Sequence, residues 1–134
     1  MQKAKIITYW VATLWLALGL VATGIVQLMH QKEGVGGAVM MQELGYPAYL
    51  MTLLGVLKIL AAAIILLPHL VLPKQWAYAG IFFLTLGAIY SHIAISGVSA
   101  AILPALLIGI LALGSWYLLP KERKIPSNII IRKV

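Results

Sequence analysis

The stretch YLMTLLGVLKILAAAIILLP, residues Tyr49 to Pro68, contains one charged residue, Lys58, close to its centre. A helix needs about 20 mostly apolar residues to cross a bilayer, and this stretch has that length. A charged side chain inside such a span is costly, and it usually faces the interior of a helix bundle and marks function. The stretch therefore predicts a membrane span that carries a functional lysine.

The composition of the whole chain points to a membrane protein. Of its 134 residues 63% are hydrophobic and 10% are charged, with a mean hydropathy of +1.02. A soluble protein of this length needs more polar surface to cover its core. Four runs are long enough to span a bilayer, and a basic tail follows them: 6–29, 47–67, 76–95, 99–119 and the tail 120–134. Because the connections are short, we expect a single all-α domain over residues 1–134, an antiparallel bundle of four transmembrane helices.

The chain contains no cysteine, which excludes dithiol exchange, thiolate metal sites and thioether-attached haem within it. The first apolar run follows Lys3 and Lys5 in the manner of a signal peptide. It is too long for that, and no small-x-small cleavage site follows it. We therefore expect an uncleaved first span.

The net charge of +7 is distributed on one side of the predicted bundle. Lysines and arginines before span one, between spans two and three, and after span four share that side: Lys3, Lys5, Lys74, Lys121, Arg123, Lys124, Arg132 and Lys133. The opposite side has Lys32, beside Glu33 and Glu43. Cytoplasmic loops carry the lysine and arginine excess, so we expect both termini in the cytoplasm and the protein in the cell (inner) membrane. This distribution indicates that the basic residues face a lipid bilayer and do not bind nucleic acid.

Lys58 is the leading site candidate. It lies eleven residues beyond Pro47, about 16 Å along a helix axis and close to the bilayer centre. Gly55, Ala61 and Ala62 share its helix face, and small residues let helices approach closely. We therefore expect Lys58 to point at another helix. The alternative is a neutral, snorkelling or structurally paired lysine.

Four further polar residues are expected at similar depths in the membrane, in the outer half of the bundle. His92 lies on a helix face with Thr85, Ala88 and Ser96, and Gln27 and His30 are three residues apart at the end of span one. Glu43 is the carboxylate best placed to pair with Lys58, provided that the segment around it folds back. These positions predict a polar cavity that opens outward and has Lys58 as its floor: Gln27, His30, Glu43, Lys58 and His92. A purely interfacial His30 and a helix-bridging Gln27 are the structural alternatives.

The connection from His30 to Tyr46 is the longest one. EGVGGAV is glycine-rich and conformationally permissive, and AVMMQEL reads as a short apolar turn. This turn is expected either on the membrane surface or folded back over the mouth of the bundle.

Three blocks resemble the DoxX-like family of small four-helix membrane proteins. They are LGYPAYLMTLLGVLKILAAAIILLP (44–68), LPKQWAYAGIFFLTLGAIYSHIAISG (72–97) and GSWYLLPKERK (114–124). The resemblance implies a four-span bundle with cytoplasmic termini. It puts these residues on family-like positions: Gly45, Tyr46, Pro47, Gly55, Lys58, Trp76, Tyr78, Gly80, Gly87, Ser91 and His92. The family is named after a subunit associated with thiosulfate:quinone oxidoreduction, so for function the resemblance implies a membrane partner of oxidoreductases. Distant animal relatives are assembly chaperones, which is the other function that the resemblance implies.

These observations favour a membrane accessory protein that binds a quinone- or lipid-like amphiphile and associates with another membrane protein, such as an oxidoreductase subunit. The alternative is an assembly factor with no small-molecule site. The residues form no autonomous catalytic constellation. Two histidines and one carboxylate could in principle bind a metal ion, and the chain offers His30, His92 and Glu43. No His-x-x-x-His spacing supports such a site, so no metal is expected. A proton relay would need suitable groups through the full thickness of the membrane, and the cytoplasmic half offers only Thr13 and a few hydroxyls. A homodimer is left open.

Overall fold

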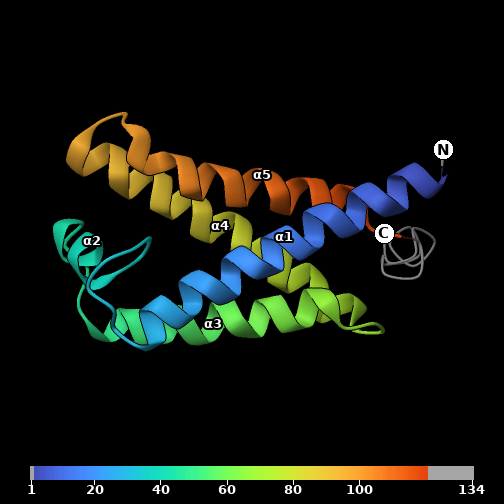
Figure 1. The fold of residues 1–134 in the computed structure, drawn as a ribbon, viewed down its shortest axis with the longest axis horizontal. Coiled ribbons are helices and arrows are strands. Elements are labelled where there is room, and N and C mark those ends of the chain that lie inside the picture. Colours follow the sequence, from blue (N-terminus) through green and yellow to red (C-terminus); the bar gives the residue numbers. More distant parts are fainter. Residues whose placement is uncertain (1, 121–134) are drawn as a thin grey trace, which may run out of the picture.

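A computed structural model describes residues 2–120 of the protein. Four long helices make up most of it (Figure 1), and none of the described residues lies in a strand. The elements are α1 (Gln2–Leu28), α2 (Ala38–Glu43), α3 (Tyr49–Leu66), α4 (Val71–Ser96), the 3-10 turn η1 (Ala100–Ile102) and α5 (Leu103–Tyr117). The basic tail predicted from residue 121 onward lies outside the described residues.

Each of the four predicted spans corresponds to one long helix, so the predicted all-α bundle is confirmed. All four helices are long and apolar enough to cross a membrane. The largest difference concerns α4, which begins at Val71 and not at residue 76. Pro73 lies in its first turn, where the missing N–H removes no helical hydrogen bond. Lys74 therefore belongs to the helix and not to a loop.

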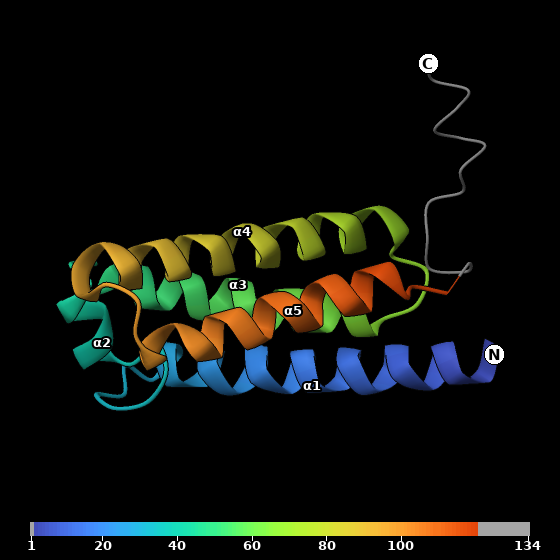
Figure 2. The ribbon, with the colours of Figure 1, turned by 90° about the horizontal axis from the view of Figure 1, so that it is seen from above.

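The helices form an antiparallel bundle in which neighbours in sequence are neighbours in space (Figure 2). α1 packs on α3 and α5, and α4 packs on the same two helices, so α1 and α4 face each other diagonally. We call the end of the bundle where α2 lies the α2 end. The opposite end, where α1 begins and α3 meets α4, is the Lys74 end.

The apolar core lies mainly in the Lys74 half. It combines large side chains of α1 with residues of the other three long helices: Tyr9, Leu16, Ala17, Leu20, Ala62, Ile65, Ala77, Tyr78, Ile81, Ala112 and Leu119. Large apolar side chains also point outward; Leu18 and Phe83 are exposed to 65% and 68%. A surface this apolar suits hydrocarbon as the surrounding solvent, because a helix satisfies its own backbone hydrogen bonds there.

The connection between α1 and α3 lies at the α2 end. The short helix α2 lies there (Figure 1) and buries Met41. The Tyr46 hydroxyl is hydrogen-bonded to the Ser91 hydroxyl of α4. Since Ser91 donates its single proton to the Gly87 carbonyl at 2.8 Å, Tyr46 acts as the donor. This bond fixes the segment that leads into α3 against the end of α4.

Candidate functional site

Lys58 lies where α1 and α3 cross most closely. Gly24 of α1 and Gly55 of α3 are both buried. A Cβ placed on Gly24 would lie 3.4 Å from the Lys58 Cβ, and one placed on Gly55 would lie 2.8 Å from the Gly24 carbonyl oxygen. The small-residue face predicted for Lys58 thus packs against another helix, α1. Among residues 2–120 the half-buried Lys58 ammonium has no hydrogen bond and no ion pair.

Gln27 lies under the loop that follows α1. Its side chain is 2% exposed, and its Oε1 has no hydrogen-bond partner. Gly36 packs directly on it: a Cβ there would lie 2.8 Å from Gln27 Nε2, and the φ of Gly36 is +76°. Only glycine combines this backbone conformation with this proximity at low cost. The loop therefore closes over a buried amide that retains an unused acceptor.

The two predicted histidines have different surroundings. His30 is exposed, and its Nε2 shares a hydrogen bond of 2.9 Å with the Thr52 hydroxyl. His92 is 8% exposed at the end of α4 and forms no hydrogen bond with any described residue. It directly follows Ser91, whose bond to Tyr46 holds this end of α4 in place. His30 thus joins a loop to α3, whereas His92 remains an interior polar group without a partner.

Glu43 ends α2, and its side chain is exposed. It forms no ion pair with Lys58 or with any other residue between 2 and 120. Lys58 lies nine residues into α3 from Tyr49, about 13 Å along the helix axis. The Glu43 carboxylate thus lies at the surface of the α2 end.

No side-chain hydrogen bond among the described residues joins any two of the five predicted site residues. Gln27, His30, Glu43 and His92 all lie towards the α2 end, and Lys58 lies deeper. Within residues 2–120 no three His, Asp or Glu side chains are close enough to hold a metal ion. The arrangement of two histidines and one carboxylate is therefore not formed there. Within residues 2–120 three of the predicted residues have unused hydrogen-bonding capacity: Gln27, whose Oε1 is buried, His92, which is buried, and the half-buried Lys58.

The model of the DoxX-like family matches residues 11–115. The chain belongs to the DoxX-like family. The match covers α3, α4 and most of α1 and α5, with every predicted site residue, and it confirms the resemblance seen in the sequence. Comparison with curated proteins and with solved structures found no match.

Two polar features of this DoxX-like bundle were missed in the sequence. The first is Lys74, which is fully buried. Its ammonium donates to the carbonyls of Ile64, Ile65 and Leu67 at 2.8, 3.1 and 2.7 Å. These carbonyls end α3, where helices leave acceptors unpaired and a cation is favoured by the helix dipole. Lys74 is therefore a cap of the preceding helix, although its position in the sequence suggested a loop charge.

The second feature is a group of hydroxyls inside the Lys74 half, which we call the hydroxyl cluster: Tyr9, Thr13, Tyr78 and Ser115. The Ser115 hydroxyl shares hydrogen bonds with those of Thr13, at 2.5 Å, and Tyr78, at 2.6 Å. Its members come from α1, α4 and α5. The sequence indicated Thr13 and a few hydroxyls for one half of the bundle but not that Tyr9, Tyr78 and Ser115 gather around Thr13.

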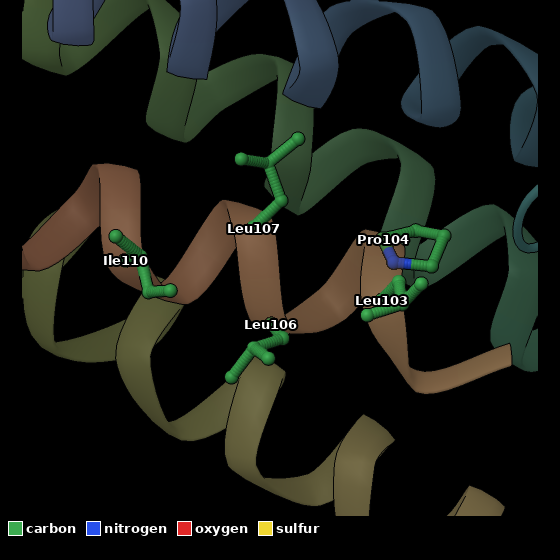
Figure 3. A pocket seen from close by; sticks show the side chains of 5 residues that line it. All are labelled: Leu103, Pro104, Leu106, Leu107 and Ile110. Carbon is green, nitrogen blue, oxygen red and sulfur yellow. The ribbon is translucent and has the colours of Figure 1, made fainter. Parts of the chain in front are cut away.

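Two of the surface hollows on the described part of the DoxX-like bundle include no predicted site residue. One, of about 530 Å³, is lined by apolar side chains of α5 (Figure 3): Leu103, Pro104, Leu106, Leu107 and Ile110. The other, of about 460 Å³, is a groove between α4 and α5 near the Lys74 end. It includes Tyr78 of the hydroxyl cluster among its lining residues.

Proposed function

We propose that this DoxX-like protein is a membrane accessory protein that binds a small quinone- or lipid-like amphiphile in the interior of its α2 half and associates with a membrane oxidoreductase. One observation carries the proposal: the Gln27 amide oxygen is buried without a partner, and the Lys58 ammonium and the His92 imidazole form no hydrogen bond or ion pair among residues 2–120. A buried polar group without a partner costs about 1–3 kcal/mol. A bound polar head would recover that cost.

The chemistry of the three groups fits a head that carries both acceptors and donors. The Lys58 ammonium only donates, the Gln27 Oε1 only accepts, and the His92 imidazole can do either. A quinone carbonyl or a lipid ester carbonyl would accept from Lys58. A hydroxyl of a quinol or of a glycerol unit would donate to Gln27 Oε1. The apolar tail would remain in the hydrocarbon region between the helices.

A second function is favoured by the same lysine. An unpaired ammonium within a membrane span can also form an ion pair with a carboxylate in the span of another protein. In that case the molecule is an assembly factor or chaperone, and it needs no small ligand. Purification from native membranes separates the two functions. A stoichiometric protein partner that is lost on substitution of Lys58, with no co-purified amphiphile, indicates the assembly role, whereas a co-purified amphiphile indicates the small-molecule site.

Lys58→Met tests the pocket. The variant keeps an unbranched side chain, one atom shorter, and removes the donor, so insertion and folding are expected to be unchanged. Loss of one charge-assisted hydrogen bond, about 1.5–3 kcal/mol, predicts roughly 10- to 100-fold weaker binding of a decyl-tailed 1,4-benzoquinone. Binding is measured by quenching of tryptophan fluorescence in nanodiscs. Lys32→Met, in the exposed loop, is the control and should bind like the native protein. Native affinity in Lys58→Met would remove the pocket.

The orientation in the membrane is part of the proposal. The distribution of lysine and arginine supports cytoplasmic termini in the inner membrane of the cell. Because the chain has no cysteine, single cysteines report topology without background. In intact cells, or spheroplasts, a membrane-impermeant maleimide should label Glu33→Cys and leave Ser127→Cys unlabelled until the cells are lysed. The reverse pattern would invert the orientation.

A further inference from the structure

The hydroxyl cluster is a closed polar site within the apolar core of the Lys74 half. Tyr9, Thr13 and Ser115 are 0% exposed, and Tyr78 is 4% exposed. Tyr9 and Thr13 are one turn apart on α1 and share a face, and the Tyr9 and Tyr78 hydroxyls are close enough to interact electrostatically. Despite this proximity, the Tyr9 hydroxyl has no hydrogen-bond partner. A fully buried phenol thus lies beside other hydroxyls without bonding to them.

Counting protons shows what the cluster lacks. Each of the four hydroxyls carries one O–H donor, and the two hydrogen bonds of Ser115 use two of these donors. The Tyr78 hydroxyl also lies near those of Thr13 and Tyr9, but the Tyr9 hydroxyl has no partner at hydrogen-bond geometry among residues 2–120. Whichever way the Ser115 bonds point, one proton of the Thr13–Ser115–Tyr78 chain remains unused. The Tyr9 proton is unused as well. Two of the four O–H donors in the cluster therefore make no hydrogen bond.

Buried donors in native proteins are almost always paired with protein atoms or with ordered water. We propose that the hydroxyl cluster is a second binding site, distinct from the pocket around Lys58, which takes one oxygen atom that accepts from both Tyr9 and the Thr13–Ser115–Tyr78 chain. Two lone pairs on one oxygen match the two unused donors. A buried water has this chemistry, and so does the carbonyl oxygen of a membrane amphiphile.

The groove between α4 and α5 gives such a carbonyl a route. Tyr78 and Ala112 line the groove, and Ala112 precedes Ser115 by one helical turn. The remaining lining is largely aromatic and apolar: Gln75, Trp76, Ala79, Phe82, Phe83, Leu113 and Trp116. At its rim the Trp116 indole donates to Gln75 Oε1 at 2.9 Å. An amphiphile lying among these side chains would have its apolar part in the groove and would present its polar end towards Tyr78.

Tyr9→Phe tests the site, because it removes one hydroxyl and leaves the ring packing intact. If an oxygen accepts from Tyr9, the variant loses a hydrogen bond, and its melting temperature in detergent should fall by about 4 °C. If the Tyr9 hydroxyl is truly without a partner, removing it leaves the protein equally or more stable. Tyr90→Phe, at a position 75% exposed, is the control and should melt like the native protein. An equal or higher melting temperature for Tyr9→Phe overturns the proposal.

Adding a decyl-tailed 1,4-benzoquinone shows whether the accepting oxygen belongs to water or to the carbonyl of an amphiphile. The measurement is made in a Lys58→Met background, so that binding in the pocket around Lys58 does not contribute. A carbonyl ligand is identified if the benzoquinone raises the melting temperature when Tyr9 is present and fails to raise it when Tyr9→Phe is added. Water is identified if the benzoquinone has no effect or the same effect on both, while Tyr9→Phe remains the less stable. These outcomes do not depend on whether an amphiphile binds near Lys58.

Discussion

Replacing Lys74 by methionine should lower the free energy of unfolding by about 3–5 kcal/mol, because three carbonyls lose hydrogen bonds to a charged donor. The native ammonium is 0% exposed and donates to three carbonyls at the end of α3. Its three N–H donors therefore have acceptors. In Lys74→Met the same carbonyls lose their charged donor.

The size of this effect follows from the charge. Hydrogen bonds between helices in membranes average about 0.6 kcal/mol, because the unfolded state in the membrane also finds partners. Hydrogen bonds to a charged group contribute about 1.5–3 kcal/mol each, and here three of them share one ammonium. The end of α3 also gains from a cation next to its dipole. We therefore expect a loss well above that of an ordinary interhelical bond.

Lys58→Met is the matched control, since it makes the same chemical change in the same bundle. Lys58 has no partner among residues 2–120, so its replacement should leave stability unchanged or raise it. Unfolding in mixed micelles, followed by circular dichroism, gives both values. Equal stability of the two variants would contradict the capping role of Lys74.

The fold was largely predictable because its signals are local. Apolar runs of sufficient length define the four spans, and the small residues Gly55, Ala61 and Ala62 indicated that Lys58 faces another helix. The start of α4 was wrong because Lys74 was interpreted as a loop charge. A lysine shortly after one helix and near the start of the next has the same sequence pattern whether it is solvated or folds back onto the preceding helix.

The hydroxyl cluster could not be predicted for a different reason. Thr13 and Ser115 are 102 residues apart, and Tyr78 and Ser115 are 37 residues apart. No periodicity within one helix reports which faces of α1, α4 and α5 meet. Similarly, the sequence could not decide between an α2 on the membrane surface and one folded over the bundle. The position of Glu43 relative to Lys58 depends on that choice.

A methyl group at Gly55 should separate α1 from α3. An added Cβ would lie 2.8 Å from the Gly24 carbonyl oxygen and 2.8 Å from Leu28 Cγ. Leu28 can move, but the carbonyl belongs to the backbone of α1, so the helices must part. Overpacking of this kind costs about 1–3 kcal/mol. Gly55→Ala should therefore lower the free energy of unfolding, although alanine is the better helix former.

Gly80→Ala provides the comparison, because a Cβ at Gly80 meets nothing within 4 Å. There the gain in helix propensity, up to about 1 kcal/mol, is not opposed by a clash, so the two alanine variants should differ in sign. Gly55→Ala should also weaken benzoquinone binding, since the Lys58 Cβ lies against Gly24 in the same crossing. Both properties are measured in one preparation, by melting temperature and by fluorescence quenching. If Gly55→Ala proves as stable as Gly80→Ala, the close crossing of α1 and α3 does not exist in the membrane, and the position assigned to Lys58 is wrong with it.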